Sequence, residues 1–331
     1  MPTDNTYISR ANLSGLIPDP VSREIMQGAV ENSAVLRVGR RLPNMTSGTQ
    51  SINVLDMLPT AYFVDGDTGF KQLSSQAWTK KKLYAEEIAV IVPIPEAVLS
   101  DANYDIWGEV RPRIAEAMGK VVDSAILFGV GAPSTWRDSI YDTASDAGMI
   151  VTESVTDPTA DPPTVADLYQ DMLGVGGLLS KVEEAGYNVT RILSDISMRA
   201  KLRGIVDGVG QPIFVTAMQQ NANYALDGTP LDFPMNGAWD KTKALMIAGD
   251  FSQLVYSIRQ DVTFKVLTEA TIVDPTTKAV VYSLAQQDMV ALRAVMRLGW
   301  EIPNPVSAYR AELETYSPFA VFAPASDSSN G

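Results

Sequence analysis

The sequence predicts an α+β fold, because strand patterns and helix patterns occupy separate stretches of the chain. Alternating residues run from Ala77 to Val92, an amphipathic helix pattern then extends to Phe128, and another long strand pattern spans Met289 to Ile302. Of the 331 residues, 46% are hydrophobic, which is ample for a packed core in a chain of this length. These observations predict a folded protein with one long helix and several long strands.

The composition excludes several classes of protein. Histidine and cysteine are both absent, so the chain has no cysteine or histidine nucleophile, no zinc finger and no disulfide framework. A formal net charge of -13 opposes broad attraction to nucleic acid, so any contact with DNA is expected to be weak. The chain shows no signal-peptide pattern and no run of ~20 apolar residues, so no membrane contact is expected.

Residues 1–48 are expected to form an extended N-terminal arm with one helix over Val21–Leu36. Apolar residues recur at helical spacing in that range, and prolines break regular structure on both sides of it. Three arginines follow the helix: Arg37, Arg40 and Arg41. They are interpreted either as a solvated basic turn or as a contact with an acidic surface on a neighbour.

Residues 49–92 are expected to form an extended hairpin. Its outbound strand is Gln50–Leu55, its turn is Asp65–Gly69, and its return strand begins at Ala77. The return strand is polar on both faces at first and apolar on both faces near Val92. A ribbon with a polar tip and an apolar base is expected to project from the body. Because an isolated two-stranded ribbon is only marginally stable in water, this ribbon is expected to pack on another surface.

Six residues of this hairpin are candidates for contact between subunits: Phe70, Lys71, Trp78, Lys80, Lys81 and Lys82. The lysines fit a solvated edge strand whose charge prevents aggregation, which needs no further function. A contact with an acidic patch on a neighbouring copy is the main alternative. Covalent use of one lysine is a third.

A long helix is predicted from Asp105, a good N-cap, to Phe128, after the chain turns at Pro93-Ile94-Pro95. Apolar residues recur at three- and four-residue steps along it. Its charged face is expected to carry Glu109, Arg113, Glu116, Lys120 and Asp123. Pro112 is expected to kink the helix, and Gly129 is expected to end it.

The second half of the chain reads as a long connection followed by shorter elements. Residues 132–163 are rich in Asp, Ser, Thr and Pro, and a helix weakened by glycines is predicted from Thr164 to Val182. A short helix over Ile196–Leu202 and a glycine-rich loop over Gly204–Pro212 follow. The predicted strands are Val189–Leu193, Ala244–Ala248, Leu254–Ile258 and Val262–Leu267, and the tail after Pro324 is polar.

No catalytic, cofactor or metal site is predicted. Gly129-Val130-Gly131 is half of a dinucleotide fingerprint, but it follows a helix where that motif must follow a strand. Asp65, Asp67 and Thr68 read as a turn, because no glutamate completes a calcium loop at the required distance. The carboxylates between Asp138 and Glu184 are scattered, so they are interpreted as a solvated acidic surface.

A set of short motifs lies in a fixed order along the chain. They are Ala61-Tyr62-Phe63-Val64-Asp65-Gly66, Val92-Pro93-Ile94-Pro95-Glu96-Ala97-Val98-Leu99-Ser100-Asp101, Val122-Asp123-Ser124-Ala125-Ile126-Leu127-Phe128-Gly129, Gly210-Gln211-Pro212-Ile213, Ile247-Ala248-Gly249-Asp250-Phe251, Gln287-Asp288-Met289-Val290-Ala291-Leu292-Arg293 and Arg297-Leu298-Gly299-Trp300. In these motifs and in the order of its parts the chain resembles the tailed-phage major capsid proteins with the Hong Kong 97-type fold, which encapsulins share. The similarity extends from Leu16 to Ala311, and the order and spacing of the motifs make it specific.

The resemblance implies a division of the chain into regions. An N-terminal arm covers residues 1–48, and an extended β-hairpin loop that lies over a neighbouring subunit covers residues 49–92. A peripheral domain with a long spine helix covers residues 93–137 and 257–308. An axial domain that meets its copies around five- and six-fold axes covers residues 138–256 and 309–331.

The resemblance also implies a function. We expect a subunit that assembles into pentamers and hexamers of an icosahedral head shell around double-stranded DNA, in the virion and after assembly in the host cytoplasm. A separate scaffolding protein, a portal and decoration proteins are the implied partners. Some relatives crosslink a hairpin lysine to a neighbour's asparagine with help from a glutamate. Lys71 is the nearest positional candidate, and no asparagine or glutamate is matched to it.

Two alternatives are retained. An encapsulin-type compartment has the same fold and encloses protein cargo in place of DNA. A carboxylate- or serine-dependent enzyme would need polar groups that converge in a pocket, and the sequence shows none.

Overall fold

The computed structural model describes residues 33–64, 70–101, 106–156, 166–205, 224–309 and 316–325. The helices are α2 (Ala34–Val38), α3 (Glu96–Asp101), α4 (Ile106–Phe128), α5 (Ile140–Asp146), α6 (Leu168–Leu173), α7 (Leu178–Glu184), α8 (Met198–Arg203) and the 3-10 helix η1 (Phe251–Gln253). The strands are β1 (Arg40–Arg41), β2 (Thr49–Met57), β3 (Ala77–Tyr84), β4 (Glu86–Pro95), β5 (Ile150–Thr152), β6 (Arg191–Ser194), β7 (Ala225–Leu226), β8 (Thr229–Asp232), β9 (Met246–Gly249), β10 (Val255–Leu267), β11 (Thr271–Val273), β12 (Val280–Ser283), β13 (Met289–Glu301) and β14 (Phe319–Ala323). The predicted α+β class is confirmed.

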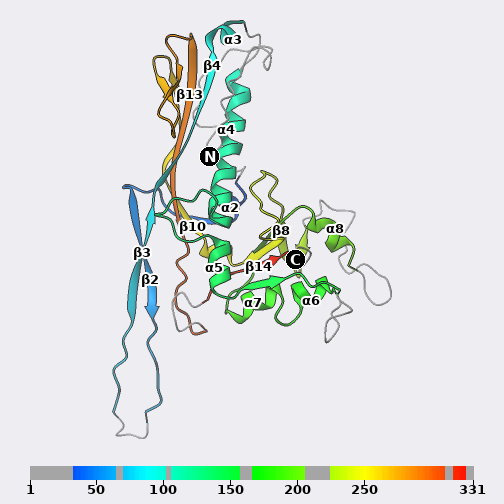
Figure 1. Ribbon diagram of the computed structural model, residues 1–331. Coiled ribbons are helices and arrows are strands. Elements are labelled where there is room, and N and C mark those ends of the chain that lie inside the picture. The colour runs from blue at the N-terminus through cyan, green and yellow to red at the C-terminus, as the bar shows by residue number, and fades with distance from the viewer. Residues whose placement is uncertain are drawn as a thin grey trace.

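The described residues form two larger sheets, a small hairpin β11-β12 and a projecting hairpin β2-β3 (Figure 1). A four-stranded sheet has the order β1-β10-β13-β4, and the long helix α4 runs beside it. A six-stranded sheet has the order β5-β14-β9-β6-β8-β7 and lies to one side with α5, α6, α7 and α8. The hairpin β2-β3 points away from the end of the molecule that carries α3. None of the described helices combines the length and apolar character needed to cross a membrane.

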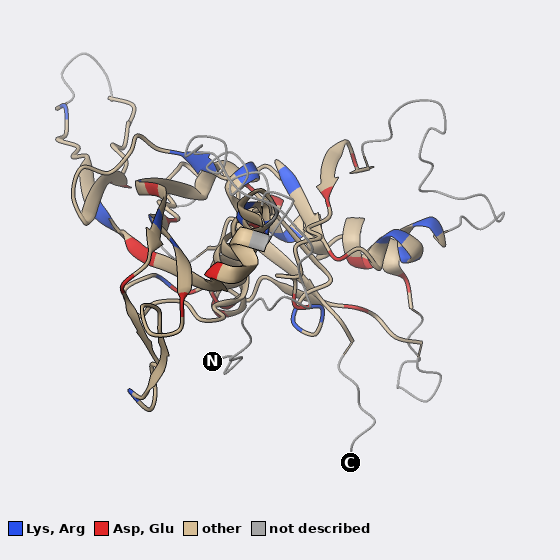
Figure 2. Cartoon of the chain, turned by 90° about the horizontal axis from the view of Figure 1, so that it is seen from above, with Lys and Arg blue, Asp and Glu red and all other residues tan. Residues whose placement is uncertain are grey.

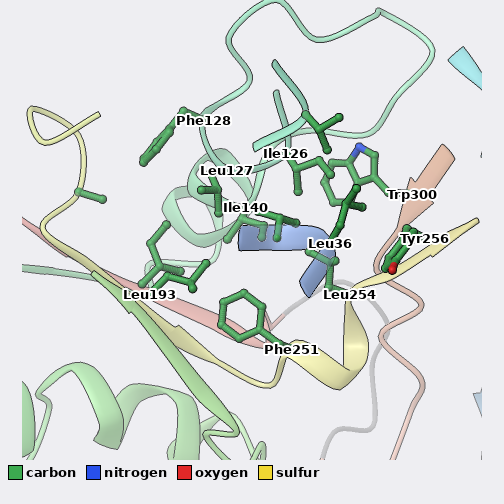
Figure 3. Close-up of a cluster of buried hydrophobic side chains, with 14 of the residues drawn as sticks. Leu36, Ile126, Leu127, Phe128, Ile140, Leu193, Phe251, Leu254, Tyr256 and Trp300 are labelled. Atoms are coloured by element: carbon green, nitrogen blue, oxygen red, sulfur yellow. The ribbon is translucent and has the colours of Figure 1, made fainter. Parts of the chain in front are cut away.

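One apolar core joins the two sheets at the C-terminal end of α4 (Figure 3). There Leu127 of α4, Leu193 of β6 and Trp300 of β13 are all almost completely buried. Because elements from both halves of the chain share this core, the two sheets are held together by burial of apolar surface.

The helix α4 ends where the sequence predicted. Gly129 has a φ of 72°, in the left-handed region that favours glycine. Its N–H donates to Ala125 at 3.0 Å, and the N–H of Val130 donates to the carbonyl of Ser124 at 3.2 Å. The bond from Gly129 to Ala125, with Gly129 in the left-handed region, is the αL motif that closes a helix. Pro112 lies inside the helix, which is continuous around it.

The predicted charged face of α4 is wrong at one position. Asp123 is completely buried, whereas Arg113 and Lys120 are exposed. Asp123 lies where α2 crosses α4, so a polar residue at this position faces another element of the protein. Helical periodicity alone does not show this contact, because α2 lies about ninety residues earlier in the chain.

The return strand of the hairpin is shorter than predicted. β3 pairs with β2, but from Glu86 onward the chain pairs with β13 and belongs to the four-stranded sheet. The predicted turn at Pro93-Ile94-Pro95 is also wrong, because β4 continues to Pro95 and the chain turns into α3 at Glu96. These prolines are tolerated because β4 lies at the edge of its sheet.

Several predicted boundaries in the second half need correction. The connection at 132–163 contains α5 and β5, and the predicted helix through Val182 is divided into α6 and α7. Gly174 to Gly177 separate these two helices, and Gly176 has a φ of 78°. The strands predicted at 254–258 and 262–267 form one bulged strand, β10. Six further elements were not predicted from the sequence: α3, β7, β8, β11, β12 and β14.

Other predictions fall outside the described residues. They are most of the helix at 21–36, the tip turn Asp65–Gly69, the N-cap Asp105, the helix start Thr164, most of the loop Gly204–Pro212 and most of the tail after Pro324.

Candidate functional site

The hairpin has one face toward the body and one face toward solvent. On the inner face Ile52 and Leu83 pack with Met45, which lies just after β1. Lys81, which pairs with Ile52, also lies on this inner face and is half-buried. On the outer face Trp78, Lys80 and Lys82 are exposed, and they pair with Leu55, Asn53 and Ser51 of β2. The base of the hairpin therefore lies on this subunit, and its outer face is available to another.

Backbone contacts fix the base of the hairpin. The indole Nε1 of Trp136 donates to the carbonyl of Tyr84 at 3.1 Å, at the last residue of β3. The N–H of Ala85 donates to Gly48 at 2.9 Å, and the N–H of Val306 donates to Leu55 at 3.0 Å. The bond between Ala85 and Gly48 joins the two ends of the hairpin, and the bonds from Trp136 and Val306 hold one strand each against the body.

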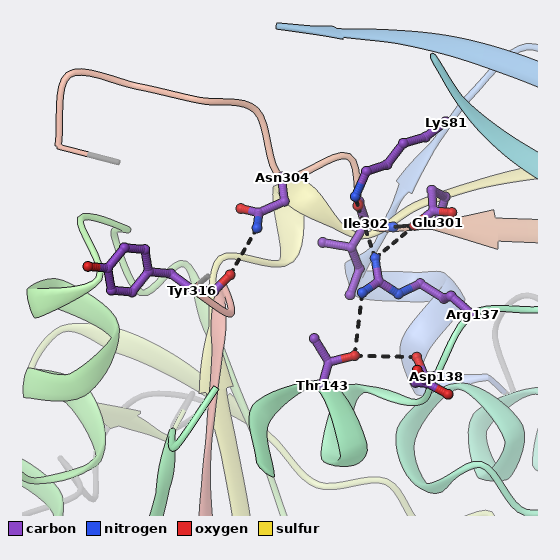
Figure 4. Close-up of polar contacts among 8 residues, drawn as sticks. All are labelled: Lys81, Arg137, Asp138, Thr143, Glu301, Ile302, Asn304 and Tyr316. Atoms are coloured by element: carbon purple, nitrogen blue, oxygen red, sulfur yellow. Dashed lines mark hydrogen bonds and ion pairs between the residues drawn. The ribbon is translucent and has the colours of Figure 1, made fainter. Parts of the chain in front are cut away.

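A groove of about 780 Å³ lies beside this base, between β3, α5 and the segment after β13. Arg137 lies in it and donates to Glu301 at 2.7 Å and to the carbonyl of Ile302 at 3.1 Å (Figure 4). Lys81 reaches the same carbonyl at 3.4 Å from the hairpin. Asn304 donates to the carbonyl of Tyr316 at 2.9 Å. The charges of Arg137 and Glu301 satisfy one another, which is typical of a structural contact.

The distal part of the hairpin exposes large apolar side chains. Phe63 and Leu73 are fully exposed, and Phe70 is 93% exposed. Trp78 is 63% exposed further toward the base. Large exposed apolar side chains that gather on one element mark a surface used for binding. Lys71 is exposed beside them.

The three candidate arginines, Arg37 in α2 and Arg40 and Arg41 in β1, do not join the hairpin as one group. Arg37 pairs with Asp232 of β8 at 3.1 Å, and Arg191 binds the other oxygen of the same carboxylate at 2.9 Å. Arg40 and Arg41 lie in β1 and are exposed, and Arg41 donates to Asn44 at 3.0 Å. Arg37 is therefore half-exposed and already paired within its own subunit, whereas Arg40 and Arg41 lie closer to the hairpin base.

The charges are interspersed over the molecule. In Figure 2 blue and red segments alternate along the chain, and the view shows no broad basic face. The short helix α8 carries a local group of basic residues, Arg199, Lys201 and Arg203. Lys201 is paired with Glu153, and Arg199 lies 4.4 Å from the ring centre of Tyr224 and 4.3 Å from that of Phe233.

Several residues of these surfaces were not predicted from the sequence. Leu73 carries a local signal, because it is a large apolar residue among polar ones near the predicted turn, whereas Phe63 lies in the apolar run Tyr62-Phe63-Val64. Trp136, Arg137 and Glu301 carry no such signal, since the contacts of Arg137 with Glu301 and of Trp136 with Tyr84 join residues far apart in the chain.

A family model described as the phage capsid family matches residues 14–309. The chain is 25% identical over 291 residues to the major capsid protein of Staphylococcus phage 80alpha, a match that covers 88% of this chain and 82% of that protein.

Solved structures give the same result. A structure from Microbacterium phage Oxtober96 is 35% identical, with a TM-score of 0.73 over 96% of this chain and 100% of that one. A structure from Mycobacterium phage Adephagia is 29% identical, with a TM-score of 0.73 over 96% of this chain and 98% of that one.

Proposed function

Because this chain belongs to the phage capsid family and is a major capsid protein of a tailed phage, we propose that its hairpin binds a second copy of the chain in the head shell. Its fold is the α+β fold of the Hong Kong 97 type, and the family is one of structural proteins, not of enzymes. Its place is therefore the shell of the virion.

The observation that carries the proposal is the exposure of Phe63, Phe70 and Leu73 at the distal part of the hairpin. Side chains of this size stabilise a protein by about 1.5–3 kcal/mol each when they become buried. Within the described part of this subunit they remain in solvent, so a second subunit is the partner that would bury them.

The charged candidates fit the same contact. Lys80 and Lys82 are exposed on the outer face of β3, Lys71 is exposed near the tip, and Arg40 and Arg41 are exposed at the base. A chain with a net charge of -13 offers many acidic groups, so a neighbouring copy can supply the opposite charges. We expect these pairs to set the register of the contact more than its affinity.

The wider assembly follows from the family. We propose pentamers and hexamers of this chain around the double-stranded DNA genome, formed in the host cytoplasm with a scaffolding protein and a portal. Decoration proteins are further candidates. The net negative charge favours a shell that holds the DNA only weakly. The encapsulin alternative predicts small shells without DNA, and electron microscopy with a nucleic acid assay distinguishes the two.

The hairpin contact is tested with Phe70→Asp and Leu73→Asp. A buried, unpaired carboxylate at the contact should prevent shell formation, while the melting temperature of the unassembled subunit stays unchanged because both side chains are exposed there. Phe70→Leu is the matched control and should form shells. Normal shells from both Asp variants in negative-stain images would contradict the proposal.

A further inference from the structure

Asp123 of α4 is a completely buried carboxylate that accepts four hydrogen bonds from two other elements. From α2 it accepts the hydroxyl of Ser33 at 2.5 Å, the N–H of Ala34 at 2.9 Å and the N–H of Val35 at 3.2 Å. From the loop after β8 it accepts the side-chain amide of Asn236 at 2.7 Å. Both carboxylate oxygens are used, each by two donors.

This carboxylate completes the start of α2. The first N–H groups of a helix have no partner within the helix, and a negative charge there is favourable. Ser33 caps the helix through its own side chain, which accepts the N–H of Leu36 at 3.1 Å and donates to Asp123. Asp123 then binds the N–H groups of the next two residues. The helix is therefore held by a residue ninety positions away.

The charge of Asp123 is balanced by dipoles alone among the described residues. The charged side chains on the packed elements are engaged elsewhere or exposed: Arg37 of α2 pairs with Asp232, Glu116 of α4 pairs with Arg113, and Lys120 of α4 is exposed. The loop 233–238 carries no titratable side chain. Burial raises the pKa of Asp123 above its ordinary value, although its four hydrogen bonds act in the other direction.

A buried carboxylate without a cation is costly to maintain, and an apolar residue at this position of α4 would pack without that cost. The carboxylate fixes the orientation of α2, because its four hydrogen-bond donors come from two elements and are satisfied in one arrangement of α2 on α4. Ser33 is the first described residue and lies directly before α2. The orientation of α2 therefore sets the point at which the preceding residues are attached to the body.

We propose that Asp123 is a positioning residue that latches α2 to α4, and so fixes the point at which the N-terminal residues are attached to the body. The role of the latch in shells rests on the proposed function. The hydrogen bonds of the latch all lie within one subunit, so the latch is tested on the unassembled chain. A negative result in that test is therefore distinguishable from a negative result for the hairpin contact.

The test is limited trypsin digestion of the unassembled chain, with and without Asp123→Asn. The amide places N–H groups where two donors now bind, so α2 should detach and cleavage after Arg37, Arg40 and Arg41 should become at least tenfold faster. Cleavage elsewhere should change by less than twofold. Asp171→Asn is the matched control: Asp171 of α6 is a half-buried carboxylate that binds the N–H and hydroxyl of Ser154, and its loss should leave cleavage at these arginines unchanged.

A second pair of variants keeps the test decisive if Asp123→Asn fails to fold. Ser33→Ala and Asn236→Ala each remove one of the four donors and leave the carboxylate in place. Each should accelerate cleavage at the three arginines by about three- to tenfold. Unchanged cleavage in both, or equal acceleration in Asp171→Asn, would overturn the proposal.

Discussion

Gly299 of β13 lies directly against the carbonyl group of Tyr84: a Cβ on Gly299 would be 2.5 Å from that oxygen and 2.9 Å from its carbon. The same oxygen accepts the indole N–H of Trp136 at 3.1 Å. The last residue of β3 is thus fixed from two sides. A hairpin that begins from a rigid base presents its distal side chains at a defined position.

Gly299→Ala should therefore move the base of the hairpin. Backbone cannot yield to the new methyl group as a side chain would, so we expect a loss of about 1–3 kcal/mol in the free energy of unfolding. Urea denaturation of the unassembled chain measures it. Gly48→Ala is the control, because nothing lies within 4 Å of a Cβ there. Equal stability of the two variants would show that the close approach to Tyr84 is not a constraint.

The ion pair between Arg137 and Glu301 should show strong coupling. The pair is mostly buried, so Arg137→Met leaves a carboxylate without its partner and should cost about 2–4 kcal/mol of unfolding free energy. The double variant with Glu301→Gln should cost clearly less than the sum of the two single changes. Additive losses in a double-mutant cycle would mean that the two side chains do not stabilise one another.

The pH dependence of stability should identify Asp123. Because burial raises its pKa in the folded chain above 3.8, the folded state binds a proton more tightly than the unfolded state. Its contribution to stability is then present below pH 3.8 and lost as the pH rises through the raised pKa. The unfolding free energy of Asp123→Asn minus that of the parent should become more positive between pH 4 and pH 7.

Asp274 provides a comparison of opposite sign. Hydrogen bonds from the backbone of Thr277 and Thr276 lower the pKa of this exposed carboxyl. Its contribution is present above pH 3.8 and lost as the pH falls through the lowered pKa. The unfolding free energy of Asp274→Asn minus that of the parent should become more negative as the pH rises from 2 to 5. If this difference changes with pH in the same direction for Asp123→Asn and Asp274→Asn, the opposite pKa shifts of the two carboxyls are contradicted.

The parts of the fold predicted from the sequence are those with local signals. The amphipathic pattern up to Phe128 and the alternation from Met289 depend on neighbours within a few residues, and both elements were confirmed. Alternation continues from β3 into β4 without a break, so the pattern gives no sign that the pairing partner changes at Ala85. Elements as short as α3 and β5 carry too few residues to show a period.

Some contact residues were predicted and others were not, because only some of them have a signal in their neighbouring residues. The lysines of β3 and Trp78 stand out because three consecutive lysines and a tryptophan lie in the part of the strand that is polar on both faces. The buried role of Asp123 does not, since its partners lie on α2 and on a loop after β8. A carboxylate at the boundary of an apolar helix face has the same pattern whether it faces water or a second helix.

The most direct measurement of the hairpin contact uses the absence of cysteine from the chain. Phe70→Cys and Leu73→Cys each introduce the only thiol, at a side chain that is almost fully exposed in the subunit. We expect reaction with a maleimide to be at least tenfold slower in assembled shells than in unassembled subunits, with equal rates after both are unfolded in urea. Equal rates in shells and free subunits would contradict the claim that this hairpin binds a second copy of the chain.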